Sequence, residues 1–264
     1  GPFAAVGFQL EKDVENGSDP ANQALVPSGV DYEKDDWDKY VLWGITKVGP
    51  VTLYPLLAYQ NRGQYLVNGE SDDMVIMSAI LGATGATDLI GWEAEGAYNS
   101  FSFSDAFAAV AYSGEDSAST FGLYGNIWFN LDMAKVGAWA AYGSVHDDTG
   151  LSYAFGDDFD SSMIIGDDLG GSTDLSGFTA GALYADITAM EKLTITPKFM
   201  YAMSNFEDDD TTAMEFDLWA SYQLMDQVKY TVGFGYADIN WEPPSGKVDT
   251  DAAMKVYHEL RLDF

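Results

Sequence analysis

The chain has 264 residues and a formal net charge of -30, from 42 acidic and 12 basic residues, with no cysteine. This balance argues against nucleic acid and anionic membrane surfaces as partners, because both need lysine and arginine, and the lack of thiols excludes a disulfide framework. Hydrophobic residues make up 47% and aromatic residues 14%, too much for a disordered acidic chain. We therefore expect an ordered scaffold that carries the acidic residues.

In chain order, the sequence divides into segments in which apolar and polar residues alternate, as they do in a strand. The closing stretch MKVYHELRLDF is the clearest case, because Met254, Val256, Leu260 and Leu262 alternate with Lys255 and other polar residues. We predict about twelve strands, at 3–12, 38–48, 51–61, 74–82, 88–98, 121–131, 136–145, 175–187, 193–204, 214–224, 228–239 and 254–264.

The connectors between these strands are alternately short and long. Short connectors are expected at 48–51, 82–88, 131–136, 189–193 and 224–228. Long, acidic connectors are expected at 13–37, 62–73, 99–120, 146–173, 205–213 and 241–253. Short turns at one end and long loops at the other are typical of an outer-membrane barrel. The sequence therefore predicts an all-β fold, a transmembrane antiparallel up-and-down β-barrel that forms one domain over residues 1–264.

The faces of the strands support this fold class. The strands at 88–98, 193–204, 214–224 and 228–239 place apolar residues on one face and ionisable, small or hydroxyl residues on the other, as a lipid face and a wet lumen require. The second, third, seventh and eighth strands are apolar on both faces, which indicates a subunit interface or a covering loop. A soluble β-sandwich is the alternative, since its strands also alternate.

Several stretches resemble the homotrimeric porins of sulfate-reducing bacteria. They include DDWDKYVLWGITKVGPVTLYPLLAYQ, MAKVGAWAAYGSVHDDTG and YQLMDQVKYTVGFGYADIN, and the terminal Phe264 on an alternating strand resembles the C-terminal signature of bacterial outer-membrane barrels. The resemblance implies a trimer in the outer membrane, in contact with the lipid bilayer and lipopolysaccharide. Members of that family have about sixteen strands, so either this barrel is shorter or N-terminal strands are absent from this sequence. The opening Gly-Pro is compatible with a mature form or a fragment.

The acidic loop at 13–37 is the predicted pore constriction, because general porins fold the corresponding loop inward. Its carboxylates would face basic side chains of the barrel wall and set a field across the opening. The loop contributes Asp31, Glu33, Asp35 and Asp36, and the wall contributes Lys198, Lys229, Lys255, Glu259 and Arg261. A solvated outer loop that carries charge for solubility is the alternative.

A second acidic cluster suits a hard cation such as calcium. It consists of Asp157, Asp158, Asp160, Asp167 and Asp168, but it lacks the calcium-loop pattern, so loose divalent bridging is the alternative. No resident cofactor is expected. The two histidines, His146 and His258, have no matching catalytic partners in the sequence, so we expect no enzyme.

The sequence therefore predicts an outer-membrane porin, a water-filled channel that favours cations and allows passive diffusion of ions and small polar solutes. An acidic scaffold or adhesin with a closed lumen is one alternative, and a soluble β-sandwich binding protein is another.

Overall fold

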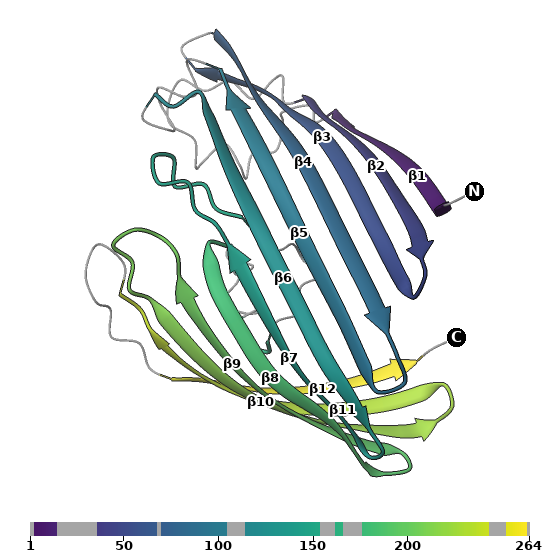
Figure 1. The fold of residues 1–264 in the computed structure, drawn as a ribbon. Coiled ribbons are helices and arrows are strands. Elements are labelled where there is room, and N and C mark those ends of the chain that lie inside the picture. Colours follow the sequence, from purple (N-terminus) through teal and green to yellow (C-terminus); the bar gives the residue numbers. More distant parts are fainter. Residues whose placement is uncertain are drawn as a thin grey trace. The chain divides into compact units, whose positions relative to one another are not determined.

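The computed structural model describes residues 3–14, 36–67, 70–104, 114–153, 162–165, 176–242 and 252–262. These residues form twelve strands in one sheet, and strand order follows sequence order from β1 to β12 (Figure 1). Neighbouring strands are antiparallel wherever their register is defined. Among the described residues, β1 and β12 are the two edge strands of this order. No described helix has the length and apolar character to cross a membrane.

All twelve predicted strands are present. The first six are β1 (Phe3–Val14), β2 (Asp36–Val48), β3 (Val51–Val67), β4 (Glu70–Ala86), β5 (Ile90–Phe103) and β6 (Ser117–Leu131). The last six are β7 (Ala134–Gly143), β8 (Phe178–Met190), β9 (Leu193–Ser204), β10 (Thr212–Met225), β11 (Val228–Asn240) and β12 (Ala253–Leu262). The sequence-based prediction of an all-β, up-and-down antiparallel fold is confirmed, and this is the architecture that outer-membrane barrels use.

The short connectors lie where the sequence predicts them. Four are two residues long, between β2 and β3, β6 and β7, β8 and β9, and β10 and β11, and the fifth joins β4 to β5. Gly49 in the first turn has φ of 62°, a left-handed conformation that glycine adopts without a steric penalty. The predicted alternation of short and long connectors is therefore confirmed at the short end.

One predicted long connector is wrong. Most of the stretch 62–73 is strand, because β3 continues to Val67 and β4 begins at Glu70. The sequence between them is Asn68-Gly69, the dipeptide most typical of a two-residue hairpin turn. The prediction weighed the polar composition of this stretch and overlooked that turn signal. Each of these strands has 17 residues, more than the roughly 9 to 11 that span a bilayer.

The chain divides into two compact units. Unit 1 comprises residues 1–83, 95–121 and 145–151, and unit 2 comprises residues 84–94, 122–144 and 152–264. In unit 1, Phe103 and Ala118 are buried beside Met74, Phe101 and Leu151. Unit 2 contains the larger buried cluster and the charged side chains described next.

Candidate functional site

The strands of unit 2 separate an apolar face from a polar face. In β10, Phe216 and Leu218 are exposed, while Glu215 and Asp217, which alternate with them, are only 1% exposed. The same two-residue period continues in β11 and β12. Most of the exposed residues of these three strands are large and apolar: Met214, Phe216, Leu218, Tyr222, Leu224, Tyr230, Val232, Phe234, Tyr236, Met254, Val256, Leu260 and Leu262. Asp238, His258 and Arg261 are exposed as well. The predicted division of faces in β10 and β11 is confirmed.

The five wall residues predicted from sequence fall on the polar face. Lys198 of β9 lies opposite Asp217 in register, and Lys255 of β12 lies opposite Gly235 of β11. Asp217 is also the register partner of Gly235. Four residues of β9 to β12 therefore lie side by side across the sheet, in the order Lys198, Asp217, Gly235 and Lys255. The remaining three are Glu259, opposite Thr231, and the pair Lys229 and Arg261, opposite each other. Their placement on one face is confirmed, and their role in a constriction stays a prediction.

A short segment of the connector between β7 and β8 packs against this polar face. We call residues 162–165 the docked segment, and all four are buried. Glu215 accepts two backbone hydrogen bonds from it, through Oε1 from the N–H of Ile164 and through Oε2 from the N–H of Ile165, both at 2.7 Å. Asp217 Oδ2 accepts a third from the N–H of Met163 at 3.2 Å. Two carboxyl groups thus satisfy three consecutive backbone donors.

The carbonyl side of the docked segment is held by a cation. Lys255 Nζ donates a hydrogen bond to the carbonyl oxygen of Met163 at 3.1 Å. The peptide groups around Met163 therefore contact a carboxylate through the N–H and an ammonium group through the C=O. Buried backbone groups need such partners, because an unsatisfied one costs about 1 to 3 kcal/mol.

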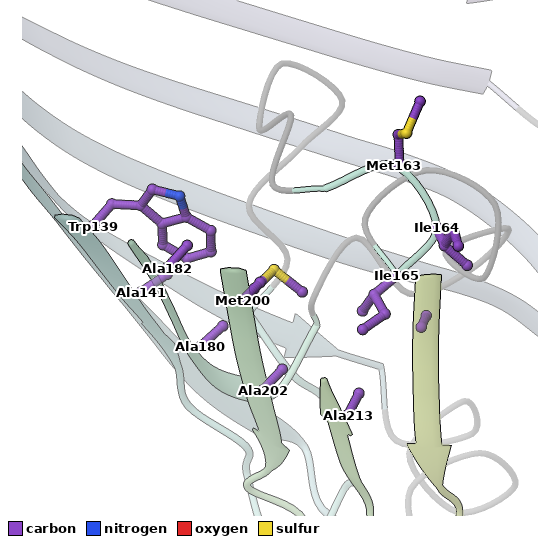
Figure 2. Packing of buried hydrophobic residues seen from close by; sticks show 11 residues of the cluster. Trp139, Ala141, Met163, Ile164, Ile165, Ala180, Ala182, Met200, Ala202 and Ala213 are labelled. Carbon is purple, nitrogen blue, oxygen red and sulfur yellow. The ribbon is translucent and has the colours of Figure 1, made fainter. Parts of the chain in front are cut away.

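Apolar side chains complete the contact. Met163, Ile164 and Ile165 belong to one buried cluster with Trp139 of β7 and Met200 of β9 (Figure 2). Around them, the strands present small residues: Ala141, Ala180, Ala182, Ala202, Ala213 and Ala237. The sequence alone indicated that the seventh and eighth strands lie under an inserted loop or at an interface. The covering loop is confirmed for β7 and β8.

Two glycines of β11 leave room for Met163. A Cβ atom added at Gly233 would lie 2.3 Å from Met163 Cε, and one added at Gly235 would lie 3.2 Å from Met163 Cβ and 2.9 Å from Asp217 Oδ1. Real Cβ atoms do not approach other atoms as closely as the shorter two of these distances. The absence of side chains at these positions therefore permits the segment to approach the wall.

A second polar network lies on the same face of unit 2, on β5, β6 and β8. Glu93 Oε1 accepts hydrogen bonds from Tyr124 Oη at 2.7 Å and from Asn126 Nδ2 at 3.0 Å. Tyr184 Oη donates to Asn126 Oδ1 at 3.1 Å. Close to the turn between β6 and β7, the Lys135 ammonium lies 3.7 Å from Asp186 Oδ2 and 5.5 Å from the centre of the Tyr184 ring. These contacts give the wall fixed polar groups rather than freely rotating ones.

The acidic loop residues predicted from sequence are not among the described positions. Asp31, Glu33 and Asp35 lie outside the described residues, and Asp36 begins β2 without a described side chain. The proposed cation ligands Asp157, Asp158, Asp160, Asp167 and Asp168 also lie outside, as does Phe264. Within the described ranges, no group of three or more His, Cys, Asp or Glu side chains is arranged to hold a metal ion.

The docked segment is the feature that sequence reasoning missed. The sequence SSMII lies in a connector that is otherwise rich in aspartate and glycine. An apolar run within an acidic loop was therefore the sequence feature that could have predicted a buried segment. Glu215 and Asp217 were assigned to the polar face but given no partner. His146 forms a side-chain hydrogen bond with Thr149 at 3.2 Å, and His258 is exposed on the apolar face.

No protein-family model and no curated protein matches the chain. Among solved structures, two of the toluene transporter TodX of Pseudomonas putida align with TM-scores of 0.43 and 0.41, each at 11% identity. The two alignments cover 94% and 90% of the present chain, and 83% and 81% of the respective TodX chains. OmpT, an outer membrane protein of Vibrio cholerae, aligns with a TM-score of 0.38 at 9% identity, over 98% of this chain and 91% of that chain. This likeness is too slight to transfer a function, and the resemblance to porins of sulfate-reducing bacteria stays a prediction.

Proposed function

We propose that the chain is a β-barrel protein of the bacterial outer membrane that forms a water-filled channel for ions and small polar solutes. One observation carries this proposal: β10, β11 and β12 expose a mainly apolar face and turn charged, hydroxyl and small side chains to the other face. In a lipid bilayer, only a closed barrel satisfies all backbone groups of such strands. Closure of the sheet, by pairing of β1 with β12 or through additional strands, is part of the proposal.

We further propose that the channel favours cations. The chain carries 42 acidic residues against 12 basic residues, and the carboxylates concentrate cations near the mouth and repel anions. The polar face itself carries charges of both signs, negative at Glu93, Asp186 and Glu259 and positive at Lys135, Lys198, Lys229, Lys255 and Arg261, so the preference is assigned to the acidic loops. The homotrimeric state, the contact with lipopolysaccharide and the loosely bound calcium of the acidic loops are parts of the same proposal. No catalytic step and no resident cofactor is proposed.

Planar-bilayer recording tests the channel directly. Purified protein, inserted in a bilayer with a potassium chloride gradient, should produce stepwise conductance increases, and the reversal potential should have the sign of a cation-preferring pore. An anion-preferring potential would contradict the role given to the carboxylates. If the protein shows the folded mobility shift on an unheated gel but produces no stepwise conductance, it does not form a channel.

A scaffold with a closed lumen is the second candidate, because the docked segment covers part of the polar face and buries Met200 and Ala202 completely. The same recording separates the two functions. A scaffold would insert into the bilayer and remain electrically silent, whereas a narrowed channel would conduct.

A further inference from the structure

The docked segment lies on the polar face of the sheet, the face that the proposed channel would turn to water. The strands that bond to it or pack against Met163, β10 to β12, turn most of their large apolar residues to the opposite face, so the segment occupies the side assigned to water. A chain segment with its side chains takes up roughly 5 to 10 Å, half to all of the spacing between two packed sheets. Any lumen bounded by this wall is narrowed by about that amount.

The attachment of the segment is specific. Three consecutive backbone N–H groups bond to carboxylates of one strand, and those carboxylates come from positions 50 to 54 residues later in the chain. The Lys255 ammonium group bonds to the carbonyl oxygen of Met163 from a third position, on β12. A loop that rested on the wall through apolar contact alone would not need two carboxylates that are 1% exposed.

We propose that the docked segment is the constriction of the channel, and that Glu215, Asp217 and Lys255 are the residues that hold it across the lumen and so set the size limit for solutes. This inference rests on the proposed channel function. It assigns the narrowing to the connector between β7 and β8, in addition to any contribution from the acidic loop at 13–37. Glu215 is the principal anchor, since it accepts the two shorter hydrogen bonds.

The first test removes the anchors. The double variant Glu215→Gln with Asp217→Asn keeps the size of both side chains, but each amide has one acceptor oxygen instead of two, so the two bonds that Glu215 accepts cannot both form. Single-channel conductance should rise by about twofold or more as the segment leaves the lumen. Asp226→Asn, the same kind of carboxylate-to-amide change at a single site in the exposed turn between β10 and β11, should leave conductance at the wild-type value.

The second test locks the segment in place. The chain has no cysteine, and a Cβ atom at position 235 would lie 3.2 Å from that of Met163, a few tenths of an ångström below the usual range for a disulfide. Met163→Cys with Gly235→Cys should therefore form a disulfide under mild oxidation. When this pair is added to the Glu215→Gln and Asp217→Asn variant, conductance should stay low while oxidised and rise after reduction.

The outcomes separate this inference from the proposed function. Wild-type conduction with no change in the double variant would overturn the constriction and leave the channel standing. Failure of the cysteine pair to cross-link in folded protein would likewise overturn it, because the segment would then not lie on the wall. If the wild type, the double variant and the reduced cysteine variant all show no conductance, both proposals are overturned.

Discussion

Replacing Gly235 by alanine tests the contact between β11 and the docked segment. The added Cβ atom would lie 2.9 Å from Asp217 Oδ1 and 3.2 Å from both Cβ and Sδ of Met163. The first distance is shorter than real contacts, and the others are tight, so the carboxylate and the segment must both move. Overpacking of this kind typically destabilises a protein by about 1 to 3 kcal/mol. Replacing a strand glycine by alanine returns roughly 0.5 to 1 kcal/mol, so we expect a net loss of about 0.5 to 2 kcal/mol.

Gly125 supplies the matched control. It lies in β6 of the same unit, and a Cβ atom added there meets no atom within 4 Å. Gly125→Ala should therefore show only the gain from replacing a strand glycine by alanine, and stabilise the protein by roughly 0.5 to 1 kcal/mol. The two variants make the same chemical change in the same sheet, so their difference, about 1 to 3 kcal/mol, reports the close contacts of position 235 with Asp217 and with the segment.

Urea titration in detergent micelles measures this difference. The folded fraction is read from the mobility of unheated samples on a gel, and the midpoint should fall for Gly235→Ala and rise or stay constant for Gly125→Ala. Equal midpoints for the two variants would refute the packing of Met163 against β11. A smaller loss for Gly235→Ala in a Met163→Ala background than in the wild type would support it, because the shorter side chain removes the contact with Sδ while the contacts with Asp217 Oδ1 and with the Cβ atom of residue 163 remain.

Three further outcomes are expected. Val232→Lys on the exposed apolar face should lower the free energy of unfolding in lipid vesicles by about 2 to 4 kcal/mol, the cost of a lysine that faces lipid near the bilayer midplane. An unchanged urea midpoint in vesicles would contradict a lipid-facing position for residue 232. Glu93→Gln should destabilise the fold by about 1 to 2 kcal/mol, because the hydrogen bonds from Tyr124 and Asn126 lose their charged acceptor; thermal unfolding of the variant in detergent checks this. Glu259→Gln should move the reversal potential of the channel toward zero, and a shift toward stronger cation preference would count against its place on the lumen wall.

The strands could be predicted from sequence because their alternation is a local property. In β10, each of Met214, Phe216 and Leu218 is followed by a residue for the other face, and the structure exposes the first set and buries Glu215 and Asp217. The two-residue turns were equally local, set by short connectors such as Gly49-Pro50. Where the prediction failed, between β3 and β4, the Asn68-Gly69 signal was present but was outweighed by the polar residues around it.

The partner of the polar face could not be predicted in this way. Carboxylates at two-residue spacing on a wet face are equally compatible with solvation by water and with hydrogen bonds to backbone N–H groups. The choice depended on a tetrapeptide 50 to 54 residues earlier, on two glycines of the next strand that leave space for Met163, and on Lys255 one strand further. Sequence periodicity determined which side of each strand faces which environment, because that information repeats every two residues. Only the tertiary structure decided what fills the polar side, because it depends on groups that are brought together only after the sheet has formed.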